Sequence, residues 1–163
     1  MTLVSMNDQE FMAAFESGQL SGKDFHHADH VHMAWLYLRT RPVLEAIADF
    51  SAALRRLAAA NGKPNLYHET ITWAYLFLVR ERMERGAECE GWNEFARANP
   101  DLLDWTSPIL KRFYREETLK SDLARRVFLL PDRPAQTEES PGDPELEFTA
   151  ETADTKSATD LHN

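Results

Sequence analysis

The feature that most constrains the fold is the spacing of the apolar residues, which recur three or four positions apart through most of residues 1–134. This spacing places apolar side chains on one face of a helix. No segment shows the sustained alternation of apolar and polar residues that predicts a strand. The sequence therefore predicts an all-α, single-domain helical bundle. The expected helices span residues 7–17, 24–39, 42–60, 65–85, 92–98, 108–114 and 121–129.

Two short connections predict how the three longest helices are arranged. Arg41 and Pro42 join the second expected helix to the third, and residues 61–65 join the third to the fourth. Because connections of this length link antiparallel neighbours, the chain should run up, down and up again. The second and fourth helices should therefore begin at the same end of the bundle.

Residues 135–163 differ in composition from the expected helical domain, residues 1–134. They are rich in Pro, Thr, Ser and Glu and have few apolar residues, which predicts a disordered acidic tail. Eight acidic residues and one lysine give this tail a charge of −7, so the domain carries only −2 of the total of −9. Neither part has the basic surface that nucleic-acid binding requires. The tail could contact a protein partner, although a solubilising extension is the simpler interpretation.

Three observations bear on the compartment in which the protein works. No stretch approaches 18 consecutive apolar residues, so we expect no contact with a membrane. The first residues, MTLVSMNDQEF, lack the basic and then apolar segments of a secretory signal. Cys89 is the only cysteine, which excludes an internal disulfide. These features predict a cytoplasmic protein.

Four of the six histidines lie in the segment FHHADHVHMAW. His27 and His30 are three positions apart, so they share one face of their helix, and that face is the apolar one. His32 is expected on the solvent side of the same helix. His26 lies between the two faces, and the pattern does not assign it. The segment therefore predicts two inward-facing histidines.

A third histidine, His68, lies in the segment YHETITW, in the first turn of the fourth expected helix. Its face continues through Ile71 and Tyr75, which again predicts an inward orientation. The up-down-up path brings this turn beside the first turn of the second expected helix. The sequence therefore predicts that His27, His30 and His68 converge at one end of the bundle.

Three converging imidazoles favour a divalent transition metal: zinc, iron, nickel or copper. Three protein ligands leave a coordination position for water or substrate, as in catalytic metal sites. Asp29 and Glu69 are candidates for a fourth ligand, for a residue that orients an imidazole, or for a catalytic general base. The residues expected to line a substrate pocket are Tyr67, Thr70, Thr72 and Arg125.

Two alternatives to a metal site remain open on these residues. A metal-free version would use His27 or His30, together with Asp29, to transfer protons. The histidines could also be hydrogen-bonded core residues, or solvated residues at the start of a helix, without any part in catalysis.

Three segments, FHHADHVHMAW, YHETITW and FYREETLKSDLARRVFLLPD, together resemble a family of small uncharacterised bacterial helical proteins. The motifs of that family are F-x-H-x-x-H-[LV], Y-H-x-T-x-T and Y-S-x-E-x-L-x-S-x-x-A-R followed by P-D. Arg115 stands where the third motif has serine. The resemblance covers residues 25–132 and implies a site, but it implies no particular reaction. The matching residues are Phe25, His27, His30, Tyr67, His68, Thr70, Thr72, Tyr114, Glu117, Leu119, Ser121, Ala124, Arg125, Pro131 and Asp132.

The sequence thus predicts a metal-dependent enzyme that acts on a small molecule through a three-histidine site. Hydrolysis, group transfer and redox chemistry are all compatible with such a site. The alternative is a non-enzymatic metal-binding or protein-interaction module.

Overall fold

The computed structural model describes residues 6–86 and 90–134. The expected disordered tail, residues 135–163, lies outside the described residues, as does Cys89. Within the described ranges the chain forms helices and no strand, which confirms the all-α prediction. None of these helices is both long enough and apolar enough to cross a membrane. The helices are α1 (Asp8–Glu16), α2 (His27–Thr40), α3 (Val43–Ala60), α4 (Glu69–Arg85), α5 (Trp92–Ala98), α6 (Pro100–Leu103), α7 (Glu116–Lys120) and α8 (Asp122–Arg126), with 3-10 turns η2 (Pro64–Leu66) and η3 (Ile109–Arg112).

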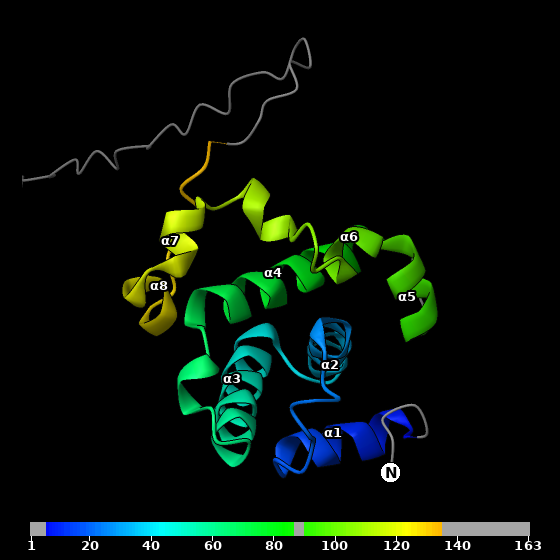
Figure 1. Ribbon diagram of the computed structural model, residues 1–163. Helices are drawn as coiled ribbons and strands as arrows, with labels where there is room; N and C mark the ends of the chain where they lie inside the picture. Colours follow the sequence, from blue (N-terminus) through cyan, green and yellow to red (C-terminus); the bar gives the residue numbers. More distant parts are fainter. Residues whose placement is uncertain (1–5, 87–89, 135–163) are drawn as a thin grey trace, which may run out of the picture.

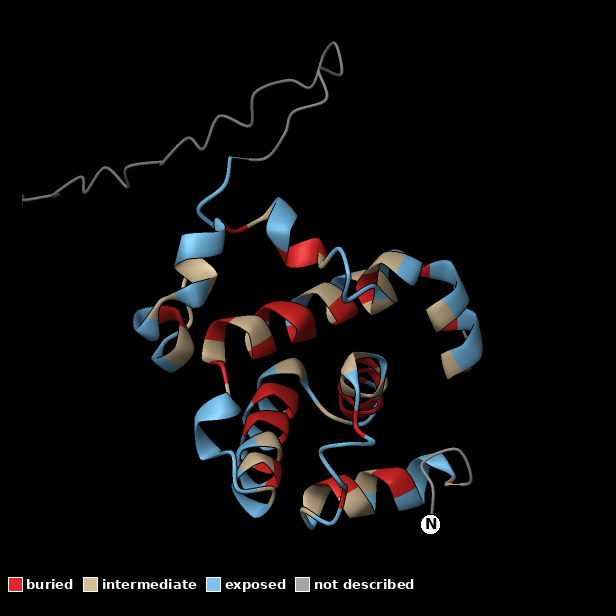
Figure 2. Cartoon of the chain, viewed as in Figure 1, coloured by how far each residue is buried: buried red, intermediate tan, exposed pale blue. Residues whose placement is uncertain are grey.

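The three long helices α2, α3 and α4 form the centre of the bundle (Figure 1). Helix α2 packs against α1, α3, α4 and α6, which explains why all of residues 33–38 are buried. The buried faces of α3 and α4 lie toward this helix (Figure 2). The start of α2, the end of α3 and the start of α4 meet around a common pocket, as the up-down-up path predicts.

Two helices begin later than their sequence suggests. Helix α2 begins at His27 rather than at Asp24, because Asp29 Oδ2 accepts a hydrogen bond from the backbone N of His26 at 2.8 Å and so fixes His26 as the N-cap. Helix α4 begins at Glu69. Its N-cap is His68, whose Nδ1 accepts a hydrogen bond from Ile71 N at 3.2 Å. Both histidines therefore precede their helices instead of lying within the first turn.

The helices of the C-terminal part of the domain differ from the predicted ones: α6 and α7 were not expected, and residues 108–114 form only the short turn η3. Helix α8 stops at Arg126, and the following residues, expected to be helical as far as position 129, are extended along α4. The hydroxyl of Thr70 holds this segment, because it donates to Val127 O at 2.8 Å and accepts from Leu129 N at 3.1 Å. Tyr114 adds a hydrogen bond from its hydroxyl to Leu129 O at 2.8 Å.

Candidate functional site

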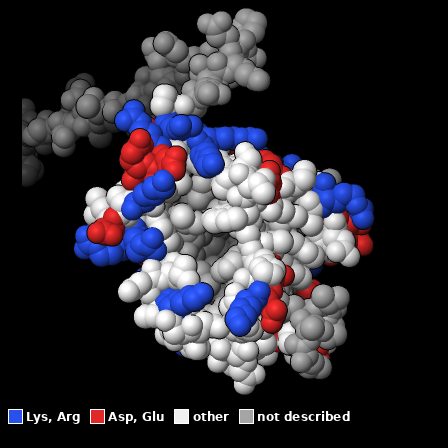
Figure 3. All heavy atoms as spheres, viewed as in Figure 1, with Lys and Arg blue, Asp and Glu red and all other residues white. Residues whose placement is uncertain are grey.

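A pocket of about 830 Å³ opens between α2, α3 and α4. This is the size of a typical small-molecule site. Trp105 and Leu66, which are 56% and 62% exposed, lie at its edge. Figure 3 shows a hollow in the middle of the face that it presents, and the surface of this hollow carries neither acidic nor basic side chains. The apolar wall includes Phe50, Leu54, Leu57, Ile71 and Leu76.

The three histidines singled out from the sequence, His27, His30 and His68, all line this pocket. All three therefore face one cavity, into which the starts of α2 and α4 open. They do not, however, form a ready-made coordination sphere. In residues 6–86 and 90–134, no group of three or more His, Cys, Asp or Glu side chains is placed to hold a metal ion. The three histidines thus share a pocket without being placed to hold one metal ion.

His27 is held by the backbone of α6. Its Nε2 lies 2.9 Å from Leu102 O. Because a carbonyl oxygen only accepts, Nε2 carries the hydrogen and Nδ1 is the basic nitrogen of the neutral ring. Burial lowers the pKa of His27, while the hydrogen bond to Leu102 and the charge of Asp104 oppose that shift. The ring is therefore neutral at pH 7.

His68 stabilises the fold, because both of its ring nitrogens form hydrogen bonds with the backbone. Its Nε2 donates to Leu119 O at 2.7 Å, and its Nδ1 accepts from Ile71 N as the cap of α4. Burial lowers the pKa of His68, the bond to Leu119 opposes this, and the charge of Arg125 lowers it further. In this arrangement His68 has no lone pair to give to a metal ion or to a substrate.

His30 differs from the other two histidines. Its ring packs on Phe25 with the centroids 4.2 Å apart, and no hydrogen bond joins its nitrogens to the described residues. Burial, followed by the charge of His27, lowers its pKa to about 4. The imidazole of His30 is therefore neutral over the physiological range, and within residues 6–86 and 90–134 its two nitrogens are free to bind a ligand.

Tyr75 is a polar residue of the pocket that the sequence did not single out for a role. Its side chain is only 7% exposed, and its hydroxyl has no hydrogen-bond partner among the described residues. The ring meets that of His27 at a centroid distance of 4.8 Å. Burial, followed by the charge of Asp104, raises the pKa of Tyr75 to about 12. A buried hydroxyl without a partner costs free energy, which a bound ligand would recover.

The two carboxylates predicted to assist the site are engaged elsewhere and do not line the pocket. Asp29 caps α2 through the backbone of His26. Glu69 Oε2 pairs with Arg55 at 2.8 Å and accepts from the hydroxyl of Tyr67 at 2.6 Å. The prediction placed them near the histidines from sequence proximity alone, whereas the helix starts turn both side chains to local partners.

Three of the four residues predicted to line a pocket do so: Tyr67, Thr72 and Arg125. Thr70 does not line it, because its hydroxyl is fully buried between α4 and the extended segment that follows α8. Arg125 Nη1 donates to Asn65 O at 3.0 Å, which places its guanidinium beside the connection between α3 and α4.

His32 and His26 complete the histidine segment. The expectation that His32 faces solvent is wrong. Its ring stacks on Trp92 at 4.3 Å, lies 5.5 Å from Phe11, and approaches Asp8 Oδ1 to 3.2 Å, because α1 and α5 cover that side of α2. His26 is exposed and lies at the margin of the pocket.

Comparison with family models, with curated proteins and with solved structures found no match for this chain. The resemblance carried by the three motifs therefore stays a prediction. Several of the motif residues join the second motif to the third in the structure. His68 binds Leu119 O, and Arg125 binds Asn65 O two positions before Tyr67. These contacts give His68 and Arg125, two residues of the motifs, a part in holding the fold together.

Proposed function

We propose that this protein binds a small carbonyl compound in the pocket and moves a proton on it. His27 acts as the general base, and Tyr75 donates a hydrogen bond to the carbonyl oxygen. The observation that carries the proposal is the buried, unpartnered hydroxyl of Tyr75 beside a histidine whose tautomer is fixed. The remaining wall is mostly apolar, which suits the body of an organic molecule.

The environment of His27 supports its role as a general base. The neutral ring presents Nδ1 as its basic nitrogen, because Leu102 O holds the hydrogen on Nε2. When Nδ1 takes a proton from the carbon next to the carbonyl, the Nε2–H bond to Leu102 O becomes charge-assisted and stronger. Asp104 then lies within electrostatic reach of the imidazolium. General bases of this kind contribute roughly 10²–10⁴-fold in rate.

Tyr75 supports the other half of the reaction. The loss of the proton to His27 leaves a carbanion whose electron pair moves onto the carbonyl oxygen, giving an enolate. With a pKa of about 12, the phenol stays protonated at pH 7 and can donate to that oxygen. Return of a proton from His27 or from water to carbon completes the cycle.

A second candidate is the metal-dependent chemistry expected from the sequence. It is favoured by His30, whose nitrogens make no hydrogen bond to the described residues, and by its closeness to His27, whose charge lowers the pKa of His30. His68 would not join such a site without giving up Leu119 O or the cap of α4. Elemental analysis separates the two cases: metal lost in His27→Ala and His30→Ala but kept in His68→Ala supports a metal held by the first two.

The proton-transfer proposal is tested with 4-phenylbutan-2-one in deuterated water, by following the exchange of its α-hydrogens by NMR. We expect the wild-type protein to accelerate the exchange, and His27→Gln and Tyr75→Phe to lose that acceleration. His26→Gln, which alters an exposed histidine at the margin, is the matched control and should keep it. Equal exchange in wild type and His27→Gln would show that His27 is not the base. Binding without any exchange would indicate a non-enzymatic binding protein.

A further inference from the structure

The charged side chains that line the pocket are all of one sign. Lys63 and Arg125 both line the pocket, whereas none of the described residues that line it is Asp or Glu. This is unexpected in a chain with 27 acidic and 18 basic residues. A pocket lined by basic but not acidic side chains favours anions over cations.

The two cations lie at the same end of the pocket. Lys63 belongs to the connection between α3 and α4, and Arg125 is tied to Asn65 O in that same connection. Arg125 also acts electrostatically on His68, at the start of α4. The start of α4 lines this pocket as well, and its backbone dipole adds to the positive potential there.

The part of the pocket beside His27 and Tyr75 has an acidic neighbour instead. Asp104 acts on both His27 and Tyr75, and it precedes Trp105 at the edge of the pocket. An anionic group is therefore disfavoured beside His27 and favoured beside Lys63 and Arg125. Between the two ends the wall consists mainly of aliphatic and aromatic side chains from α2, α3 and α4.

We infer that the ligand is an amphipathic organic anion with its carboxylate at Lys63 and Arg125 and its apolar body along α3 and α4. This inference rests on the proposed function, because it assigns the other end of the ligand to the unpartnered hydroxyl of Tyr75. The two cations fix the orientation, and the apolar wall provides the affinity. A neutral molecule of the same shape would lack the first of these contributions.

Three eight-carbon probes test the charge: octanoate, octanamide and octylammonium, each titrated calorimetrically into the full-length protein. We expect octanoate to bind about three- to tenfold more tightly than octanamide, as one or two partly exposed ion pairs imply. Octylammonium should bind most weakly. Raising the salt from about 50 to 500 mM should weaken the binding of octanoate, because salt screens its attraction to the two cations, and should leave the neutral octanamide unchanged.

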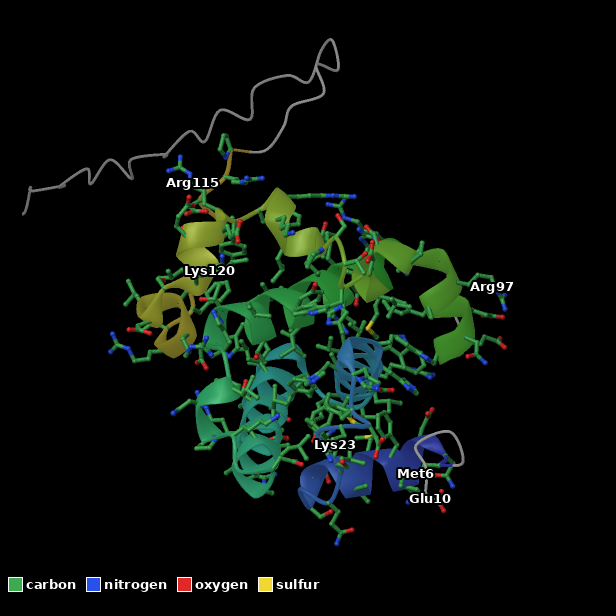
Figure 4. All side chains as sticks on the ribbon, viewed as in Figure 1. Met6, Glu10, Lys23, Arg97, Arg115 and Lys120 are labelled. Carbon is green, nitrogen blue, oxygen red and sulfur yellow. The ribbon has the colours of Figure 1, made fainter. Side chains whose placement is uncertain are left out.

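Lys63→Gln is the decisive variant, because Lys63 is exposed and its loss should leave the fold intact. It should weaken octanoate about threefold or more and leave octanamide unchanged. The matched control is Arg97→Gln, since Arg97 points away from the bundle on α5 (Figure 4). Leu54→Trp, which fills the apolar wall, should abolish binding of both probes.

The outcomes separate this inference from the proton transfer. Equal affinity for octanoate and octanamide, or tighter binding of octylammonium, would overturn the anion site and leave the exchange assay with His27→Gln unaffected. Failure of every probe to bind would overturn it too. Selective octanoate binding that Lys63→Gln removes would support the anion site, even where the exchange assay shows no proton transfer.

Discussion

The ring of Tyr75 meets the ring of His27 nearly edge-on, with centroids 4.8 Å apart and ring planes at 66°. Tyr75 comes from α4 and His27 from the first residue of α2, so the packing of these two helices sets their relation. One side chain has its polar atom fixed by Leu102 O, and the other has a buried hydroxyl with no partner in the part of the chain that the structure describes. A fold under selection for stability alone would gain from a phenylalanine at position 75.

Replacing Tyr75 with phenylalanine should therefore separate stability from function. We expect Tyr75→Phe to unfold at the same temperature as the wild type or a few degrees higher, because it removes a buried polar atom without leaving a cavity. For a domain of this size, about 1 kcal/mol corresponds to roughly 2–4 °C. Thermal unfolding without ligand measures this. A loss of more than about 1 kcal/mol would show that the hydroxyl has a partner in the unliganded protein.

The placement of the three histidines around one pocket was predictable because it depends on topology, and two short connections determine the topology. What each nitrogen does was not predictable, because this depends on main-chain carbonyls from distant segments. Leu102 O and Leu119 O lie 75 and 51 positions away from the histidines that they bind. No side-chain pattern reveals a carbonyl partner.

Residues covered by other helices were also beyond the sequence pattern. His32 was assigned to solvent from the face of α2 alone, but α1 and α5 close over that face. Tyr75 was visible as part of the stripe that continues from His68, and a tyrosine on an inward face could have been singled out because its hydroxyl needs a partner. Nothing in the sequence indicated that this partner is missing.

Because His68 caps α4 and binds Leu119 O, different substitutions of it should lower the stability by different amounts. His68→Ala should lower the free energy of unfolding by about 1–3 kcal/mol, because it removes the cap of α4 and the bond to Leu119 O. His68→Asn should recover part of this loss, since asparagine is a good N-cap residue. Urea denaturation measures both. If a chelator destabilised the wild type but not His68→Ala, His68 would instead be a metal ligand.

The stability of the protein should depend on pH through its buried histidines. The pKa of His30 is about 4 in the folded state and about 6.5 in an unfolded chain. Between these values the unfolded chain binds more protons, so stability is complete above about pH 6.5 and is lost as the pH falls toward 4. The burial of His27 and His68 acts in the same direction. Unfolding temperatures from pH 8 to pH 4 should show this decline.

The variant His30→Gln tests the origin of that decline. Because glutamine does not titrate, we expect a flatter dependence of the unfolding temperature on pH between about 6.5 and 4 than in the wild type. The exposed His26 offers a matched control, since His26→Gln should leave the dependence unchanged. An equally steep decline in His30→Gln and the wild type would place the responsible protons on other groups.

The ion pair between Arg82 and Asp101 should control His27 from a distance. Arg82 Nη2 binds Asp101 Oδ2 at 2.8 Å and Nη1 binds Oδ1 at 3.1 Å, which fastens α6 to α4. The next residue, Leu102, is fully buried and provides the carbonyl that orients His27. Arg82→Gln should lower the free energy of unfolding by about 1 kcal/mol, as a partly exposed bidentate pair implies. It should also speed the exchange of the His27 Nε2 hydrogen with water, seen by NMR.

The neighbouring pair Arg80–Glu84 is the matched control for this prediction, because it joins two residues of α4 and binds no other segment among the described residues. Arg80→Gln should change the free energy of unfolding by less than about 0.5 kcal/mol, since exposed i,i+4 pairs contribute little. It should not alter the exchange at His27. If Arg82→Gln behaved like Arg80→Gln in both measurements, the packing of Leu102 alone would hold α6. The tautomer of His27 would then be set by the core rather than by the ion pair.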